Sequence, residues 1–353
     1  MNAPELSELP IGYPVLWRDE VTATLYSHYP ESERTPERDC LIELASGELE
    51  DALYSELQAL RDREIPVPDE GQEEELPASL PVRTSARMTG GMRTVTIANH
   101  AGGVTKTTLV LSAGYELAQA GLKVLVVDMD AQGSLTRWLG VHDARREETI
   151  YNVATEDAPL PEPRHVWGMD LIPATKDLTV AEPLTLVTPG AIMRLRRRID
   201  ENRGRWDVVL FDCPPSLGAL FGLAAVASDS LIVPLPTSNK GIEALDNLMP
   251  AVEAYRAYNP ALSVKLYVPT MYSSRRNGDR EVLELLQQQL PTLATPVPER
   301  PAVWKDAAKA GKPVGVFAPY SDATQDAKRV AHEIAAALDI EMPSVLTGKD
   351  AAK

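Results

Sequence analysis

Residues 97–110 read IANHAGGVTKTTLV, and this stretch decides the fold. Apolar residues run up to Asn99 as in a buried strand, and Lys106 opens a stretch that is typical of a helix. Gly102 and Gly103 permit a tight backbone between them. In a turn of this kind the backbone N–H groups converge on a phosphate, and the positive end of the helix adds to the attraction. The stretch therefore predicts a phosphate-binding loop.

The side chains that follow the glycines support this interpretation. Lys106 supplies a cation for phosphates, and the hydroxyl of Thr107 is a suitable magnesium ligand. However, the usual pattern GxxxxGK[ST] is not met, because His100 and Thr105 stand in its two glycine positions. On this stretch alone, a glycine-containing turn that binds no ligand remains an alternative.

In two further segments, an apolar run ends in acidic residues. VLVVDMDAQGSLT (124–136) carries Asp128 and Asp130, and WDVVLFDCPPSLG (206–218) carries Asp212. Ligands of open α/β sheets bind at the carboxyl ends of the strands, so these acids are expected beside the first loop. There Asp212 is placed to hold magnesium through water.

From Arg93 on, strand-like and helix-like stretches alternate. The predicted strands are continuous apolar runs, as in parallel strands that are covered on both faces. They are Thr94–Asn99, Leu122–Asp128, Val208–Asp212, Leu231–Pro234 and Val264–Val268. The prediction is an α/β domain with a doubly wound, mostly parallel sheet.

The acidity of the chain is concentrated near its N-terminus. Residues 1–91 hold 20 acidic and 7 basic residues, a charge of −13, whereas the whole chain of 353 residues carries −16. The acidic, proline-containing stretch 69–91 predicts a flexible linker. It separates a small acidic α+β module (1–68), with strands near Val21–Leu25 and Asp39–Ala45 and a helix from Ser46, from the main domain (92–340) and a tail (341–353).

The remaining composition excludes several classes of protein. No apolar run approaches the roughly 20 residues of a membrane span, and no signal peptide is recognisable, so we expect a cytoplasmic protein without membrane attachment. Cys40 and Cys213 show no motif spacing. The five histidines do not have the spacing of a metal site that is built from protein ligands alone.

Taken together, these motifs resemble the ParA/MinD family of deviant Walker A P-loop ATPases, and specifically its ParA partition branch. The resemblance covers about residues 92–338, roughly 70% of the chain. Further family-like segments are MDLIPATKDLTVAE, DSLIVPLPTS, VPTMY and AGKPVGVFAPYSDATQDAKRVAHEI.

The resemblance implies a site for ATP and Mg²⁺. Lys106 and Asp130 would be catalytic, with Asp130 orienting the attacking water, and Gln132 and Gly133 would belong to the same switch-like segment. The cofactor-binding residues would be Gly102, Gly103, Val104, Thr105, Lys106, Thr107 and Thr108. The metal site would use Thr107, Asp128 and Asp212.

Two positions depart from the family's KGGVGKTT loop. The signature lysine, which reaches the partner subunit's phosphates in the family's dimer, is replaced by Ala101, which predicts slow turnover. Thr105 replaces a glycine, so we expect unusual dihedral angles there. Lys176, or else Lys240, is our hypothesis for the source of the lost charge; unchanged ATP-dependent dimerisation and turnover in Lys176→Ala would exclude Lys176.

The resemblance also implies partners. These are a second copy of the chain in an ATP-dependent homodimer, DNA bound without sequence preference at the nucleoid, and a centromere-binding (ParB-like) protein. Candidate DNA-binding residues are Arg275, Arg276, Arg280, Lys305, Lys309 and Lys312. The arginines of residues 194–198 can instead be a solvated helix face. The acidic N-terminal module shows no helix-turn-helix pattern, which favours a protein partner or an autoregulatory role.

The leading functional prediction is therefore an ATPase that segregates plasmid or chromosomal DNA. One alternative is a cargo-positioning ATPase that acts on a load other than DNA. Another is a nucleotide-gated scaffold with little or no hydrolysis.

Overall fold

The computed structural model describes residues 91–100, 103 and 105–342, together with the backbone of strands β1–β6. The chain divides into two compact units. One comprises residues 1–83 with 314–325, and the other residues 84–313 with 326–353. Most of the expected linker, 69–91, and of the expected tail, 341–353, lies outside the described residues.

The N-terminal unit contains an antiparallel five-stranded sheet with the strand order β4-β3-β2-β1-β5. Its strands are β1 Pro14–Trp17, β2 Val21–His28, β3 Cys40–Leu44, β4 Leu49–Ala52 and β5 Leu57–Ala59. The two strands predicted from the alternating pattern are confirmed as β2 and β3.

The predicted helix from Ser46 is wrong at Leu49–Ala52 and Leu57–Ala59, which are strands. Leucines three or four residues apart indicated a helical face, but β4 pairs with β3 and β5 pairs with β1. Ser46 and Gly47, residue types that favour turns, separate β3 from β4 in the sequence. Pairing between neighbouring strands therefore outweighs a weak helical preference here.

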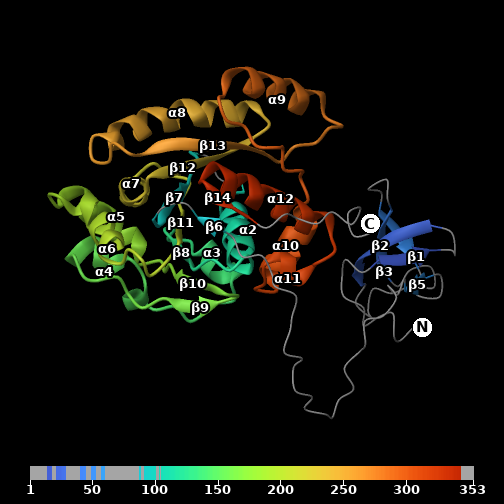
Figure 1. Ribbon diagram of the computed structural model, residues 1–353, viewed down its shortest axis with the longest axis horizontal. Coiled ribbons are helices and arrows are strands. Elements are labelled where there is room, and N and C mark those ends of the chain that lie inside the picture. Colours follow the sequence, from blue (N-terminus) through green and yellow to red (C-terminus); the bar gives the residue numbers. More distant parts are fainter. Residues whose placement is uncertain are drawn as a thin grey trace, which may run out of the picture. The chain divides into compact units, whose positions relative to one another are not determined.

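The larger unit is built on a seven-stranded sheet with the order β13-β12-β7-β11-β8-β10-β9 (Figure 1). Its strands are β7 Arg93–Ile97, β8 Val124–Asp128, β9 Arg164–Val166, β10 Met169–Ile172, β11 Val208–Asp212, β12 Ser230–Pro236 and β13 Ser263–Thr270. All neighbouring strands are parallel except β9, which is antiparallel to β10. The predicted mostly parallel sheet is confirmed.

Helices connect these strands. They are α2 Lys106–Gln119, α3 Ser134–Trp138, α4 Tyr151–Glu156, α5 Leu178–Val187, α6 Arg194–Glu201, α7 Ala219–Ala227, α8 Asn239–Arg256, α9 Asn277–Gln289, α10 Pro301–Lys309, α11 Val314–Phe317 and α12 Asp322–Ala337. Within the described part of the chain, no helix combines the length and the apolar character that crossing a membrane requires.

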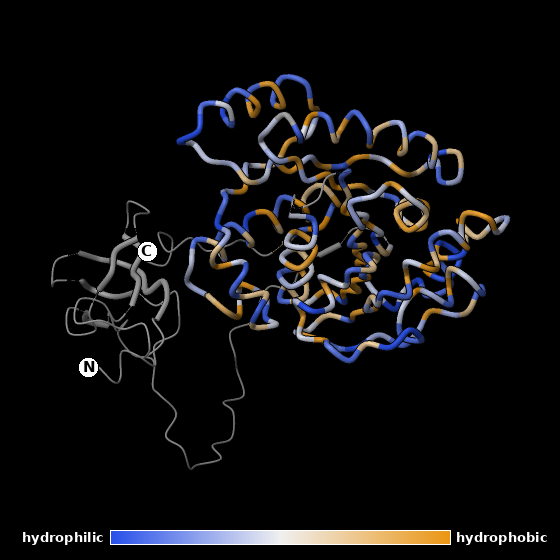
Figure 2. Tube along the Cα trace, turned by 180° about the vertical axis from the view of Figure 1, so that it is seen from behind, coloured by the Kyte–Doolittle hydropathy of each residue, from blue (hydrophilic) through white to orange (hydrophobic). Residues whose placement is uncertain are grey.

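Side chains at alternate positions of the strands belong to two hydrophobic clusters, one on each face of the sheet. Leu125 and Val127 pack with side chains from helices α4–α8, whereas Val124 and Val126 pack with α2, α3 and the C-terminal part of α12. Figure 2 shows this apolar interior along the central strands. Because both faces are covered, the carboxyl edge of the sheet is where loops can build a site.

The chain returns to the amino edge of the sheet at its C-terminus. Within the stretch predicted as a linker, β6 (Arg87–Met88) pairs antiparallel with β14 (Ile340–Glu341). Arg93 also donates from Nε to the carbonyl oxygen of Leu338 at 2.8 Å. Two residues of the expected linker are therefore held by a strand pair.

Candidate active site

The loop between β7 and α2 brings Lys106 to the carboxyl edge of the sheet. Lys106 is the first residue of α2 and is only 7% exposed, and its Nζ lies 3.4 Å from the carbonyl oxygen of Asn99. Burial lowers the pKa of Lys106, and the charges of Asp212, Cys213 and Asp130 oppose that shift. An anion at this loop would stabilise the charged amine.

Thr105 adopts a left-handed backbone conformation, with φ 69° and ψ 18°. This confirms the expectation of unusual dihedral angles. Gly103 also has a positive φ, of 71°, while Ala101, Gly102 and Val104 lie outside the described residues. A β-branched residue at positive φ is an outlier, and strain of this kind typically costs about 1–3 kcal/mol.

We expect Thr105→Gly to be more stable than Thr105→Ala by about 1–2 kcal/mol, because only the alanine keeps a Cβ in the left-handed region. Both variants remove the threonine hydroxyl, so their difference isolates the backbone conformation. The measurement is chemical denaturation of the full chain. Equal free energies of unfolding in the two variants would contradict a strained loop.

Asp128 and Asp212 end neighbouring strands and face each other in the β8–β11 register. Asp212 is also opposite Ile97, the last residue of β7. Both acids are essentially inaccessible to solvent. The carboxyl ends of β7, β8 and β11, which the sequence pattern predicted to meet, therefore lie side by side.

The carboxylate of Asp128 is fully engaged within the protein. It accepts hydrogen bonds from the backbone N–H groups of Asp130 (3.1 Å) and Thr136 (2.9 Å) and from the Thr136 hydroxyl (2.7 Å). Burial raises the pKa of Asp128 to about 6, and these hydrogen bonds oppose the shift. Asp128 is thus placed to fix the 130–136 segment.

Asp212 has the opposite character. Neither of its buried carboxylate oxygens accepts a hydrogen bond of ordinary geometry from the described residues. Burial, reinforced by Asp128, raises the pKa of Asp212 well above its usual range, while Thr107 and Lys106 lower it. Buried carboxylate oxygens with no other partner, beside a threonine hydroxyl, are a donor set that suits Mg²⁺.

A pocket of about 310 Å³ gathers most of the predicted residues. It is lined by Gly103, Thr105, Lys106, Thr107, Thr108, Asp130, Ser134, Trp138, Cys213 and Pro215. Asp130 is held at its rim, because its Oδ1 accepts the backbone N–H of Gln132 at 2.8 Å. We call this the phosphate pocket.

A second, mainly apolar pocket of about 330 Å³ shares Gly103, Thr105, Thr108 and Trp138 with the phosphate pocket. Its other walls come from distant segments, including Met271, Val297–Pro301 and Trp304. None of these residues was among the predicted cofactor-binding residues. The proline-rich stretch PVPERPAVW (296–304) was the only available signal, and it matches no recognised motif.

The predicted DNA-binding residues flank α9 and α10, and not all of them are free. Arg276 forms ion pairs with Asp279 (3.2 Å) and Glu299 (2.6 Å), and Lys309 pairs with Asp306 (3.4 Å). Arg280 donates to Asn277, and Lys305 lines the apolar pocket. Arg275 and Lys312 are exposed, and neither forms an ion pair with an acid in the described ranges.

Three of the four arginines of α6 form ion pairs, and the fourth, Arg194, donates to the carbonyl oxygen of Ala154 at 2.6 Å. Arg196 binds Asp200 and Asp229, Arg197 binds Asp157, and Arg198 binds Asp157 and Glu201. Of these three arginines only Arg197 is exposed, at 54% of its side chain, against 22% for Arg196 and 20% for Arg198, so the solvated-face interpretation fits Arg197 alone.

Lys176 and Lys240 both follow strands at the carboxyl edge of the sheet, after β10 and β12, and both are exposed. Neither lines the phosphate pocket of its own chain.

Comparisons with known proteins agree with this geometry. A family model described as an AAA domain matches residues 92–264. The chain is 40% identical over 233 residues to the probable plasmid-partitioning protein ParA of Thermus thermophilus, covering 63% of this chain and 72% of that protein. It is 32% identical over 248 residues to the sporulation initiation inhibitor protein Soj of Bacillus subtilis, covering 69% and 98%.

Solved structures give the same result. Cobyrinic acid a,c-diamide synthase from Mycobacterium smegmatis, with bound ATP analogue and magnesium, is 30% identical with a TM-score of 0.57, covering 72% of this chain and 100% of that one. A complex of a McdA variant from Cyanothece with ATP has a TM-score of 0.63 at 20% identity, covering 72% and 99%, and shares the fold. The chain belongs to the ParA family of P-loop ATPases.

Proposed function

We propose that this protein is a partition ATPase that binds Mg-ATP in the phosphate pocket and uses its slow hydrolysis to move DNA. The observation that carries the proposal is the convergence of Lys106, Thr107 and Asp130 on one pocket, with Asp212 buried behind Thr107. Relatives named as partitioning proteins and a 30% identical structure with ATP analogue and magnesium support it.

Each residue of the phosphate pocket has a role that phosphoryl transfer requires. Lys106 and the backbone of the 101–108 loop hold the phosphates, and Asp130 orients the attacking water. Thr107 and Asp212 would hold Mg²⁺, which supplies charge neutralisation when it is bound. Asp128 contributes to this metal site indirectly, by fixing the segment that carries Asp130.

The apolar pocket fits the nucleoside part of ATP. It opens from the same loop residues as the phosphate pocket and is walled by Trp304, Met271 and the 297–301 stretch. An aromatic ring in an apolar wall suits a planar base, with few polar groups needed to orient it.

Two copies of the chain are proposed to associate on Mg-ATP. With Ala101 in the signature position, the loop contributes no lysine across the dimer, so turnover is expected to be slow unless Lys176 or Lys240 supplies the charge. For comparison, a cation supplied in trans contributes about 10³–10⁵ in rate in GTPases. DNA and a centromere-binding partner are the proposed stimulators of turnover.

The binding step is tested by titrating the full chain with Mg-ATP. We expect Lys106→Met to weaken binding by roughly ten- to a hundredfold, because a charged hydrogen bond contributes about 1.5–3 kcal/mol. Lys265→Met, which changes an exposed lysine on β13, is the matched control and should bind normally. Equal affinity in wild type and Lys106→Met would refute the assignment of the phosphate pocket.

A further inference from the structure

A third pocket lies beside the switch-like segment of Gln132 and Gly133. The proposed function assigns it no ligand, although one of its lining residues, Lys176, is a candidate for the charge lost at Ala101. Its volume is about 200 Å³, and its walls come from two segments: Ala131–Ala144, which includes α3, and the loop Ala174–Lys176. Three of its lining side chains are basic: Arg137, His142 and Lys176. We call it the Lys176 pocket.

The charge of this pocket is unusual for so acidic a protein. The net charge of the chain is −16, yet no Asp or Glu is among the residues that line the pocket. Arg137, His142 and Lys176 form no ion pair with any acid in the part of the chain that the structure describes, whereas Arg196, Arg197 and Arg198 of α6 are paired. The cationic side chains of Arg137 and Lys176 and the imidazole of His142 therefore share a small space whose walls carry no acid.

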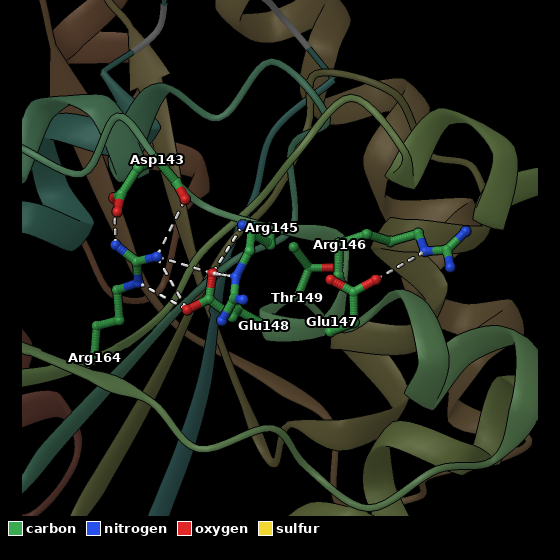
Figure 3. A network of polar contacts seen from close by, with 7 residues as sticks. All are labelled: Asp143, Arg145, Arg146, Glu147, Glu148, Thr149 and Arg164. Atoms are coloured by element: carbon green, nitrogen blue, oxygen red, sulfur yellow. Dashed lines mark hydrogen bonds and ion pairs between the residues drawn. The ribbon is translucent and has the colours of Figure 1, made fainter.

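Two acids near His142 in the sequence are bound to an arginine outside the pocket. Asp143 and Glu148 both bind Arg164, at 2.5 and 2.8 Å, as Figure 3 shows. Hydrogen bonding from Arg164 lowers the pKa of Glu148 to about 2. This network engages both acids with Arg164 and fixes the loop that carries His142.

Asp130 and Asp177 are also occupied. Asp130 accepts the backbone N–H of Gln132, and Asp177 accepts the hydroxyl of Thr175 at 2.8 Å. The pocket's donors remain available: the guanidinium of Arg137 donates one N–H to the carbonyl oxygen of Gln132, and the amine of Lys176 makes no hydrogen bond to a described residue.

The two walls are tied together through Thr136. Its hydroxyl donates to Asp128 and accepts the backbone N–H of Ala174 at 2.9 Å. Gly133, with φ 59°, allows the close approach, because a Cβ there would lie 3.2 Å from the carbonyl oxygen of Ala174. The backbone that carries the basic side chains is thus linked, through Thr136, to the segment that carries Asp130.

We propose that the Lys176 pocket binds inorganic phosphate. A pocket of this size is below the range of about 300–1,000 Å³ that is typical for larger ligands. A guanidinium, an amine and an imidazole without acidic partners match a doubly charged oxyanion better than a single carboxylate. Because its wall carries Gln132, bound phosphate would restrain the segment that positions Asp130.

The test is a phosphorus NMR titration of the full chain with inorganic phosphate in the Lys106→Met background, which weakens phosphate binding at the nucleotide loop. We expect saturable binding that Lys176→Gln and Arg137→Gln each weaken by about tenfold or more. Lys265→Gln is the matched control and should change nothing. Acetate at equal ionic strength should not compete.

Three outcomes would overturn the proposal. They are no saturable binding, equal weakening by Lys265→Gln, or binding in wild type that Lys106→Met abolishes. Lys176→Gln is the more informative variant, because this exposed side chain makes no described contact that the fold needs. Arg137, in contrast, also donates to the carbonyl oxygen of Gln132. Mg-ATP affinity is measured separately, so failure here leaves the proposed function standing.

Discussion

Asp130→Ala is expected to lower the rate of ATP hydrolysis by about 10²–10⁴, the range for losing a positioned group that handles the proton of the nucleophile. Asp130 lines the phosphate pocket together with Lys106 and Thr107. Mg-ATP affinity should change little, because the loop and Lys106 are intact. The measurement is single-turnover hydrolysis with the full chain.

Asp130→Asn is the matched control for geometry. Its side-chain oxygen can still accept the backbone N–H of Gln132, which Asp130 does at 2.8 Å, so it keeps the segment in place while removing the charge. We expect it to be nearly as inactive as Asp130→Ala. Near wild-type turnover in either variant would show that another group orients the water.

We expect the chain to bind DNA only with ATP, and we expect its affinity for DNA to fall steeply as the salt concentration is raised. Each neutralised phosphate contributes about 0.9 to the slope of log affinity against log salt. The double variant Arg275→Gln/Lys312→Gln should reduce that slope by about 2, because each removed phosphate contact lowers it by about 1. The measurement is fluorescence anisotropy with a labelled duplex of arbitrary sequence.

Arg276 is deliberately left out of this variant, because its ion pairs with Asp279 and Glu299 make it part of the local structure. Lys265→Gln again serves as the control, since it removes one exposed charge on β13. Binding that is independent of ATP, or a salt slope that the double variant leaves unchanged, would argue against these residues. Complete absence of DNA binding would favour the alternative of a load other than DNA.

The sequence predicted the centre of the fold because strong local signals coincide there. Continuous apolar runs ending in Asp128 and Asp212 required parallel strands with buried ends, and the register places these two acids opposite each other. The unusual dihedral angles of Thr105 were predictable because a β-branched residue replaces the glycine of the loop that this sequence resembles.

Other features depend on contacts that no local pattern contains. Leu49–Ala52 forms a strand because β3 lies beside it, although the leucine spacing suggested a helix. The wall of the apolar pocket joins Met271 and Trp304 to a loop near residue 105, far away in the chain. The different roles of Asp128 and Asp212 emerge only from their hydrogen bonds: one carboxylate is saturated and the other has none of ordinary geometry.

The central claim, that this chain hydrolyses ATP in the pocket of Lys106 and Asp130, is tested most directly by phosphate release from Mg-ATP in the presence of DNA. The expected result is slow turnover by the full chain that DNA increases and that Asp130→Ala abolishes. Tight Mg-ATP binding with phosphate release no faster than that of Asp130→Ala would contradict the claim and identify a nucleotide-gated scaffold instead.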